Sequence, residues 1–437
     1  MGSALQHSRL LHGFAWLTAG ATLLLLGVGG LVTSHGAGMA VPDWPTTYGY
    51  NLFFFPFSYW MGGVFYEHSH RLVATVVGVL VVGLTRWLGG RPSRLPLAII
   101  GSLEFLAGWL MVALGPQWKG AGHFLAGIGG VVLVAAAVWA RNSPAPRPLP
   151  LLGWLAFFGV QIQGLLGGLR VVLFQDEIGI FHATLAQMFF LLLGVIVLLT
   201  SRWWKTLVAG LSETRPRIST RLSWWILGAT ALILVQLVIG ATMRHQHAGL
   251  AIPDFPLAYG KVWPAMDASS VAAYNRQRLE ITAVNPITAF QIGLQMTHRL
   301  VALGILAAVA ACAGQAWRLA RRSDVAEAGA VTRPVRSLAR LCLGWLGLIL
   351  VQALLGAATI WSNKAADLAT AHVIFGALSL ALGGVASGVC LKIRIPARGR
   401  LEGLEPELRQ EDNAIPNAGF RSFPGRTQPA GAAGHAS

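Results

Sequence analysis

Long apolar segments alternate with short polar ones along almost the whole chain. A helix needs about 20 mostly apolar residues to cross the hydrocarbon core of a bilayer. Segments of about that length predict membrane-spanning helices near residues 12–33, 67–88, 96–115, 121–140, 151–173, 181–200, 223–243, 290–316, 338–360 and 369–391. We therefore expect an all-α polytopic membrane protein with about ten spans.

Composition and charge agree with this expectation. Of the 437 residues, 54% are hydrophobic and 11% are charged, and the mean hydropathy is +0.59. The formal net charge of +16 could indicate a nucleic-acid partner, but most Lys and Arg residues fall in segments that the spans place on one side. The first loop on the other side, residues 34–66, contains none. The positive-inside rule then predicts a multi-pass protein of the inner (plasma) membrane with both termini cytoplasmic. The charge reflects topology, and we expect no nucleic-acid partner.

One half of the chain repeats the other. The sequence His-Arg-Leu-Val-Ala occurs at residues 70–74 and again at 298–302. Upstream of both copies the same residues recur at a constant offset, in the order Gly29, Gly38, Pro42, Asp43, Pro45, Tyr48 and Gly49, matching Gly240, Gly249, Pro253, Asp254, Pro256, Tyr259 and Gly260. The Pro-Asp-aromatic-Pro segments within these stretches are interpreted as rigid turns.

A second shared feature is the spacing Gln-x-x-x-Gly, at Gln163 and Gly167 and again at Gln352 and Gly356. Residues four apart lie on one helix face, where glycine allows close approach and the amide can hydrogen-bond to a neighbour. Helix packing alone is the simpler explanation of these positions.

The repeats predict the domain organisation. Each half starts inside and crosses an even number of times, so the halves are parallel repeats. We expect two four-helix bundles, at residues 1–200 and 223–392, joined by an inner linker at 201–222. The helices within about 96–140 have no counterpart in the second half and are interpreted as an insertion. Residues 393–437, rich in Pro, Gly, Ala and Arg, are expected to form a disordered cytoplasmic tail.

Histidines occupy matching points near the outer ends of four predicted spans: His70, His182, His298 and His372. An ionisable residue within a membrane helix is a functional hypothesis by default. Two facing helices in each half would give bis-imidazole ligation of a heme iron. For a single histidine, packing or hydrogen bonding is the alternative. His123, in an inserted helix, is either structural or the alternative second ligand of the first half.

The halves differ beside the first histidine. Glu67 precedes His70 by three positions, so both lie on one helix face, whereas the second half has Gln295, which cannot ionise. This difference suggests chemistry at one heme and a fixed cofactor at the other. The alternative is a carboxylate that merely orients an imidazole or caps a helix. Arg71 and Arg299 suit heme propionates, although they could equally extend to the membrane interface.

The remaining polar residues and the cysteines are expected to have structural roles. Glu104 lies mid-span and must be protonated or paired, with His123 as the expected partner. Histidines expected at the outer surface are His35, His68, His245 and His247. Cys312, Cys342 and Cys390 lack a CxxC spacing and are expected to be packing residues.

These features resemble the heme A synthase family. Glu67-His68-Ser69-His70-Arg71 fits the family's ExxHR signature, and the Gly-rich end of the first span, the Pro-Asp-Trp-Pro loop and the four histidines fit as well. The resemblance covers roughly residues 12–392. It departs from the family in having ten rather than eight spans, and in lacking the outer-loop cysteine pair of some bacterial members.

The resemblance implies a function. The C-terminal pair, His298 and His372, would hold heme b, and the N-terminal pair, His70 and His182, would bind heme O and its product heme A. The family oxidises the methyl group at carbon 8 of heme O to a formyl group for terminal oxidases, and Glu67 matches its important glutamate. Expected partners are heme O, the lipid bilayer, heme O synthase, terminal oxidase assembly factors and an electron carrier that the sequence does not identify.

Two other functions fit parts of the pattern. A diheme b-type electron-transfer protein explains the four histidines but gives no role to the difference between Glu67 and Gln295. A heme carrier using its repeats for alternating access would be expected to bind at the membrane midplane, whereas these histidines lie at a shallow depth.

Overall fold

The computed structural model describes residues 2–138, 144–213, 220–277, 286–326 and 332–394. Within these residues ten helices are long and apolar enough to cross a membrane. They are α1 (Gly2–Ser34), α2 (Gly62–Gly89), α3 (Arg94–Leu114), α4 (Lys119–Ala137), α5 (Leu149–Val172), α6 (Asp176–Thr200), α8 (Thr220–His245), α10 (Ala289–Ala326), α11 (Thr332–Trp361) and α12 (Ala366–Arg394). A helix satisfies its own backbone groups in lipid. The prediction of an all-α protein with about ten spans is confirmed.

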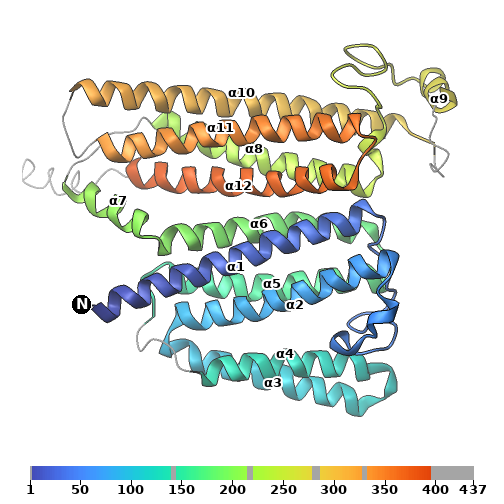
Figure 1. Ribbon diagram of the computed structural model, residues 1–437, viewed down its shortest axis with the longest axis vertical. Helices are drawn as coiled ribbons and strands as arrows, with labels where there is room; N and C mark the ends of the chain where they lie inside the picture. Colours follow the sequence, from blue (N-terminus) through green and yellow to red (C-terminus); the bar gives the residue numbers. More distant parts are fainter. Residues whose placement is uncertain (1, 139–143, 214–219, 278–285, 327–331, 395–437) are drawn as a thin grey trace, which may run out of the picture. The chain divides into compact units, whose positions relative to one another are not determined.

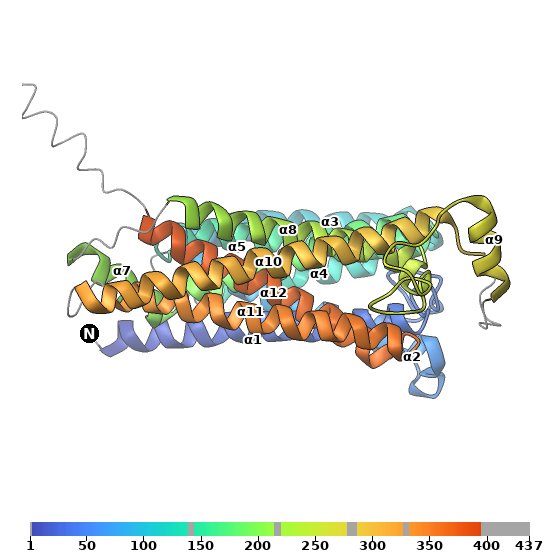
Figure 2. The same ribbon diagram turned by 90° about the horizontal axis from the view of Figure 1, so that it is seen from above.

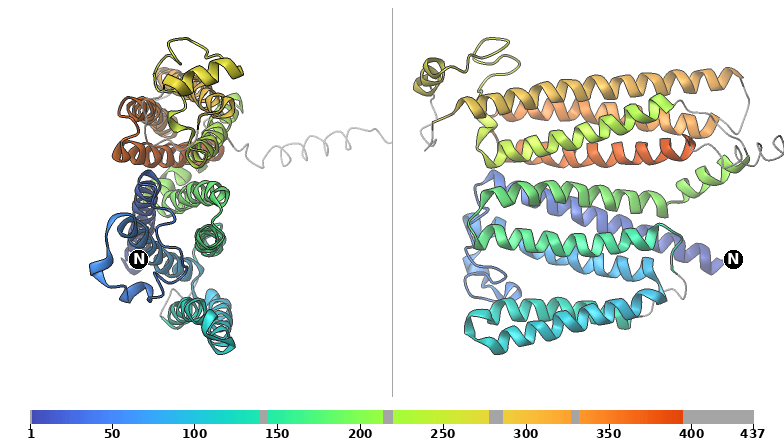
Figure 3. Two further views of the ribbon diagram at one scale, coloured as in Figure 1. Left: turned by 90° about the vertical axis from the view of Figure 1, so that its right-hand side faces the viewer. Right: turned by 180° about the vertical axis from the view of Figure 1, so that it is seen from behind.

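Eight of these helices form two rings of four (Figure 1). In the first ring α1 contacts α2, α2 contacts α5, α5 contacts α6, and α6 contacts α1. The second ring closes in the same way through α8, α10, α11 and α12. Buried side chains fill both rings, including Leu84 and Leu193 in the first and Ile226 and Trp345 in the second. α12 also packs against α1 and α6 of the first ring, so the rings share an interface (Figure 3).

The rings use the residues of the two predicted bundles, and their parallel-repeat relationship stays a prediction. The predicted inner linker contains a further helix, α7 (Arg202–Glu213). Almost all of the predicted tail lies outside the described residues.

The predicted insertion forms a tight pair, α3 and α4, on the side of the first ring away from the second (Figure 1). Glycines allow the close contact, because a β-carbon at Gly101 would lie only 2.9 Å from the carbonyl oxygen of Gly129. Arg86 of α2 holds the pair by donating to the carbonyls of Ala135, at 3.1 Å, and Val138, at 3.2 Å. An apolar cluster packs beneath, made of Val82, Leu97, Val132, Ala136 and Phe157.

The long connections gather at the end of the helices opposite the N-terminus, which we call the loop end (Figure 2). Residues 35–61 join α1 to α2 there, and the connection from α8 to α10 contains a short helix, α9 (Ala268–Gln277). Tyr274 of α9 stacks on Tyr259, with ring centroids 3.6 Å apart and planes 5° from parallel. The helices α2, α6, α10 and α12 all begin at the loop end, which is where the candidate site lies.

Candidate functional site

The four predicted histidines share one level and one cavity. His70, His182, His298 and His372 lie six to nine residues after the first residue of their helices, which is about 9–14 Å along a helix axis. All four line a single cavity of about 2170 Å³ that extends into both rings. Typical ligand pockets measure about 300–1,000 Å³, so this cavity has room for two large ligands.

Each imidazole lies against a glycine of the neighbouring helix, an arrangement we call a glycine notch. The pairs are His70 with Gly29, His182 with Gly167, His298 with Gly240, and His372 with Gly356, and a β-carbon at the glycine would lie 3.1–3.3 Å from the ring. A larger residue would push the ring away. The glycines of the Gln-x-x-x-Gly pattern therefore make room for a histidine as well as for a helix.

The glutamines of the same pattern hold three of the histidine helices. Each glutamine Nε2 donates to the histidine backbone carbonyl across the interface: Gln163 to His182 at 3.2 Å, Gln236 to His298 at 2.9 Å, and Gln352 to His372 at 2.9 Å. α1 carries Leu25 at the corresponding position, so the His70 helix lacks this bond. His123 has neither glutamine nor notch; its ring meets Trp109 edge-on at 5.7 Å between centroids.

The second pair has the spacing expected of two ligands on one metal. The rings of His298 and His372 have centroids 6.4 Å apart and planes 61° apart. A metal held about 2 Å from one nitrogen of each ring would place the centroids about 6 Å apart. His70 and His182 line the same cavity, but their rings make no direct ring contact in the described structure.

The donor set fits a heme. Among the described residues there is no group of three or more His, Cys, Asp or Glu that could hold a bare ion. Two imidazoles suffice for a heme iron, because the porphyrin supplies its other ligands. The Nδ1 atoms of His182, His298 and His372 are buried and have no hydrogen-bond partner in the described structure. These rings are thus positioned by packing, next to an apolar cavity of sufficient size.

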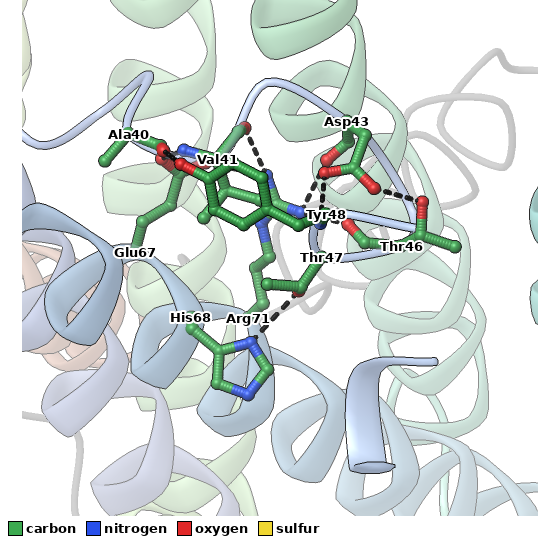
Figure 4. A network of polar contacts seen from close by, with 9 residues as sticks. All are labelled: Ala40, Val41, Asp43, Thr46, Thr47, Tyr48, Glu67, His68 and Arg71. Atoms are coloured by element: carbon green, nitrogen blue, oxygen red, sulfur yellow. Dashed lines mark hydrogen bonds and ion pairs between the residues drawn. The ribbon is translucent and has the colours of Figure 1, made fainter. Parts of the chain in front are cut away.

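Glu67 is buried, with 4% of its surface exposed, and lies in the polar network of Figure 4. Its Oε2 accepts from the backbone N–H of Val41 at 2.9 Å, and its Oε1 accepts from Nη2 of Arg71 at 2.7 Å. Arg71 also donates to the carbonyls of Val41 at 3.0 Å, Asp43 at 2.7 Å and Thr46 at 2.7 Å. Both terminal nitrogens of Arg71 are therefore engaged by the loop and by Glu67.

In the second ring an amide replaces this charged pair. Gln295 Oε1 accepts from the backbone N–H of Ile252 at 2.7 Å, and its Nε2 donates to the carbonyl of Ile252 at 3.2 Å. Arg299 donates to the carbonyls of Asp254 at 2.7 Å and Leu257 at 2.9 Å. Gln295 satisfies both backbone groups of the residue that matches Val41, without an ion pair. Glu67 and Gln295 therefore hold the loop in the same geometry, but only Glu67 carries a charge.

The Pro-Asp-aromatic-Pro segments are turns closed by their aspartates, as predicted. Asp43 accepts from the backbone N–H groups of Tyr48 at 2.7 Å and Gly49 at 2.9 Å and from the hydroxyl of Thr46. Burial by itself raises the pKa of this carboxyl, but the three donors outweigh it and hold the pKa below its ordinary value. Asp254 accepts from the matching N–H groups at 2.7 and 2.8 Å.

Two cavity-lining arginines, Arg170 and Arg244, are missing from the sequence-based site. Each lies about one turn beyond a notch glycine, Gly167 or Gly240, so a cation following that glycine within a span could have revealed them. Their Nη2 atoms are engaged, by Asp176 at 3.1 Å for Arg170 and by Gly30 O at 2.6 Å and Ser34 Oγ at 2.5 Å for Arg244. Their Nη1 atoms have no hydrogen-bond partner among the described residues. Such donors suit a carboxylate.

Three expectations about neighbouring polar residues are wrong. His68 is fully buried between the rings of Phe55 and Trp60, because the aromatic loop covers it. His245 is also largely buried, packed on Gly179 and 3.9 Å from Asp176. Glu104 accepts from Nε2 of Gln161 on α5 at 2.7 Å, and not from His123, because the Gln161 side chain reaches it from α5. His35 and His247 are exposed, as expected.

Comparisons with known proteins bear on this geometry. Residues 117–383 match the family model described as "Cytochrome oxidase assembly protein". A heme A synthase from Geobacillus kaustophilus is 26% identical over 377 residues, covering 84% of this chain and 87% of that protein. One from Lysinibacillus sphaericus is 27% identical over 263 residues, covering 59% of this chain and 65% of its own length. One from Brucella ovis is 29% identical over 161 residues, 37% of this chain and 38% of that protein.

Proposed function

The chain belongs to the cytochrome oxidase assembly protein family, and on that premise we propose that it is a membrane-bound heme A synthase. The similar proteins named heme A synthase agree with the resemblance drawn from the sequence. In this proposal the protein is an oxidoreductase that converts the carbon-8 methyl group of heme O to a formyl group. The product, heme A, serves cytochrome oxidase.

One observation carries the proposal. Two histidine pairs line one cavity, and an ionisable carboxylate accompanies only the first pair, while the second has an amide in the same geometry. We assign His70 and His182 to the substrate heme O and its product, and His298 and His372 to heme b. Heme b, when bound, would supply a one-electron redox centre. The Nη1 donors of Arg170 and Arg244 would bind the propionate carboxylates. Arg71 and Arg299, whose Nη atoms are engaged by their own loops, would add positive charge beside them.

The chain's own contribution is position and charge. The notches and glutamines fix the imidazoles, and the mostly apolar cavity excludes water from the substrate. Oxidation of an unactivated methyl group removes electrons and protons from it. The Glu67 carboxylate could accept a proton or stabilise developing positive charge. Its ion pair with Arg71 keeps it oriented, with one oxygen on Val41 and the other on the guanidinium.

The proposal also places the protein. We assign it to the inner (plasma) membrane with both termini cytoplasmic, so that the loop end and the histidines face the outside. The outer side is consistent with a loop of residues 34–66 that contains no Lys or Arg. Heme O synthase, assembly factors of the oxidase and an electron carrier are proposed partners.

Co-expression tests the function directly. The full chain would be produced with a heme O synthase in a host that makes no heme A, and extracted hemes would be separated by chromatography. We expect hemes with a hydroxymethyl or formyl group at carbon 8. Unmodified heme O with bound heme b would refute the synthase and favour the diheme electron-transfer alternative.

A further inference from the structure

The cavity extends further from the histidines in the first ring than in the second, and it does so only along α2 and α5. On α2 its lining runs from His70 to Val82, twelve residues or about 18 Å of helix. On α5 it runs from Gly167 down to Phe157, ten residues or about 15 Å. On the matching helices of the second ring, α10 and α11, the lining ends eight residues from His298 and seven from Gly356, about 12 and 10 Å away.

The inserted helix α4 forms the third wall of this extension, which we call the deep groove. Lys119 and His123 line the cavity at the start of α4, and from Phe124 onward the lining residues of α4 are apolar: Phe124, Leu125, Gly127, Ile128, Val131 and Val132. Val79 and Gly78 of α2 and Val160 of α5 line the other walls. The apolar cluster of Val82, Val132 and Phe157 closes the inner end. The groove therefore runs from the level of the first histidine pair toward the middle of the membrane, between α2, α4 and α5. Its inner end is closed by this cluster.

Polar contacts hold the inserted pair at a fixed place beside the groove. Glu104 of α3 accepts from Gln161 of α5 at 2.7 Å, and Arg86 of α2 binds two carbonyls at the end of α4. In hydrocarbon, groups that lose such bonds find no water to replace them. Among the described residues the second ring has no equivalent pair, so the deep groove and the inserted helices occur together.

We propose that the deep groove binds the isoprenoid chain of the substrate heme. The proposal rests on the proposed function, since heme O carries such a chain and heme b does not. The groove is continuous with the cavity at His70 and is long enough for several isoprene units. Its walls are mostly apolar, with Thr75 of α2 and Gln161 of α5 as polar exceptions. The insertion thereby distinguishes the substrate site from the heme b site of the second ring.

The groove acts mainly by fixing orientation. Lipid is as apolar as the groove, so moving the chain from bilayer to protein gives little hydrophobic driving force. A chain held between α4 and α5 does prevent the porphyrin from rotating about the axis between the two imidazoles. The macrocycle would then keep one orientation relative to Glu67, so that the same methyl group is presented at every turnover.

Filling the groove tests the proposal. Gly127 lines the groove, and a β-carbon there would meet nothing within 4 Å, so Gly127→Phe introduces a side chain without a backbone clash. Gly130→Phe is the matched control, because Gly130 lies on the same helix in equally open space but does not line the cavity. Gly164→Leu narrows the cavity from α5 and guards against a folding defect peculiar to α4.

Binding is measured without turnover. The full chain, purified in detergent with heme b in the second ring, is titrated with heme O or with additional heme b and followed by visible absorption. We expect the wild type and Gly130→Phe to prefer heme O. Gly127→Phe and Gly164→Leu should weaken heme O by about tenfold or more, a factor worth about 1.4 kcal/mol, and leave heme b unchanged.

Two results would contradict the proposed role of the groove. Gly127→Phe and Gly164→Leu could both keep the wild-type preference for heme O, or both variants could bind heme O and heme b equally more weakly. The failure of the proposed function looks different. If the wild type fails to convert heme O, but prefers heme O to heme b and loses this preference in Gly127→Phe, the proposed function is wrong and the proposed role of the groove is supported. If it converts heme O with no effect of filling, the groove is wrong and the function stands.

Discussion

The two rings position their histidines and loops in the same way, but they differ in the charge beside the first histidine. Both hold two histidines in glycine notches, and both close the loop before the first histidine with an aspartate turn. In the first ring Glu67 binds a loop N–H and Arg71, whereas in the second Gln295 binds a loop N–H and loop carbonyls and forms no ion pair. The comparison teaches that the loop geometry does not require a carboxylate. A buried ion pair has a large desolvation cost, so its presence in one ring calls for a reason beyond packing.

Removing a ligand histidine is the strongest way to separate the rings. With His298→Ala we expect loss of the heme b signal and of conversion, since the remaining imidazole of His372 cannot hold the iron on both faces. With His70→Ala we expect loss of conversion while the heme b signal is retained. Absorption spectra of purified protein and chromatography of its hemes distinguish the two. Loss of both hemes from either variant would mean that the rings do not bind independently.

Exchanging the charge is the next test. Glu67→Gln makes the first ring resemble the second, and the amide can keep the Val41 bond as Gln295 keeps that of Ile252. We expect heme content to be unchanged and conversion to fall by about 10²–10⁴-fold, the usual range for a lost acid–base group. Heme content and conversion are measured on the same preparation. Equal loss of heme and conversion would assign Glu67 a structural role.

The reverse exchange sharpens the same comparison. Gln295→Glu places a carboxylate in the second ring, where Arg299 is already engaged by Asp254 and Leu257. A buried carboxylate without a partner is destabilising, so we expect a lower melting temperature and no new activity at the second heme. An unchanged melting temperature would show that Arg299 leaves the loop to pair with it.

The notches predict a smaller difference between the rings. At Gly29 a β-carbon would lie 3.1 Å from Nε2 of His70, and at Gly240 it would lie 3.3 Å from Cε1 of His298. Gly29→Ala should therefore disturb its heme site several-fold more than Gly240→Ala, although alanine favours a helix over glycine by roughly 0.5–1 kcal/mol. Retention of each heme during dilution measures the effect. If both variants retain their hemes equally well, the glycine notches do not determine how firmly each heme is held.

Much of this architecture could be predicted from the sequence. Apolar segment length predicted the ten spans, because a bilayer imposes one length on every crossing helix. The shared HRLVA segments and turn residues indicated the histidine positions, since equal local sequence produced equal turns around Asp43 and Asp254.

The errors have a common physical cause, because contacts between distant helices leave little trace in local sequence. His68 was expected at the surface, yet Phe55 and Trp60 from the preceding loop enclose it. Glu104 was paired with the wrong partner, since its hydrogen bond to Gln161 joins two helices that are distant in the sequence. Arg170 and Arg244 were missed for the same reason.

The smallest predicted effect concerns the aspartate turns. The pKa of Asp43 lies below its ordinary value of 3.8, so its ionised form stabilises the folded loop. That stabilisation is fully present above about pH 4 and is lost as the pH falls through the lower folded pKa. Asp43→Asn removes the charge at every pH and should cost about 1–2 kcal/mol locally. Protection of the Gly49 amide against hydrogen exchange measures this, with Asp254→Asn as the matched control that should affect Gly260 instead. If Gly49 stays fully protected in Asp43→Asn, the loop before the first histidine is held by Arg71 and Glu67 alone, and the charge that distinguishes the two rings has a structural as well as a chemical consequence.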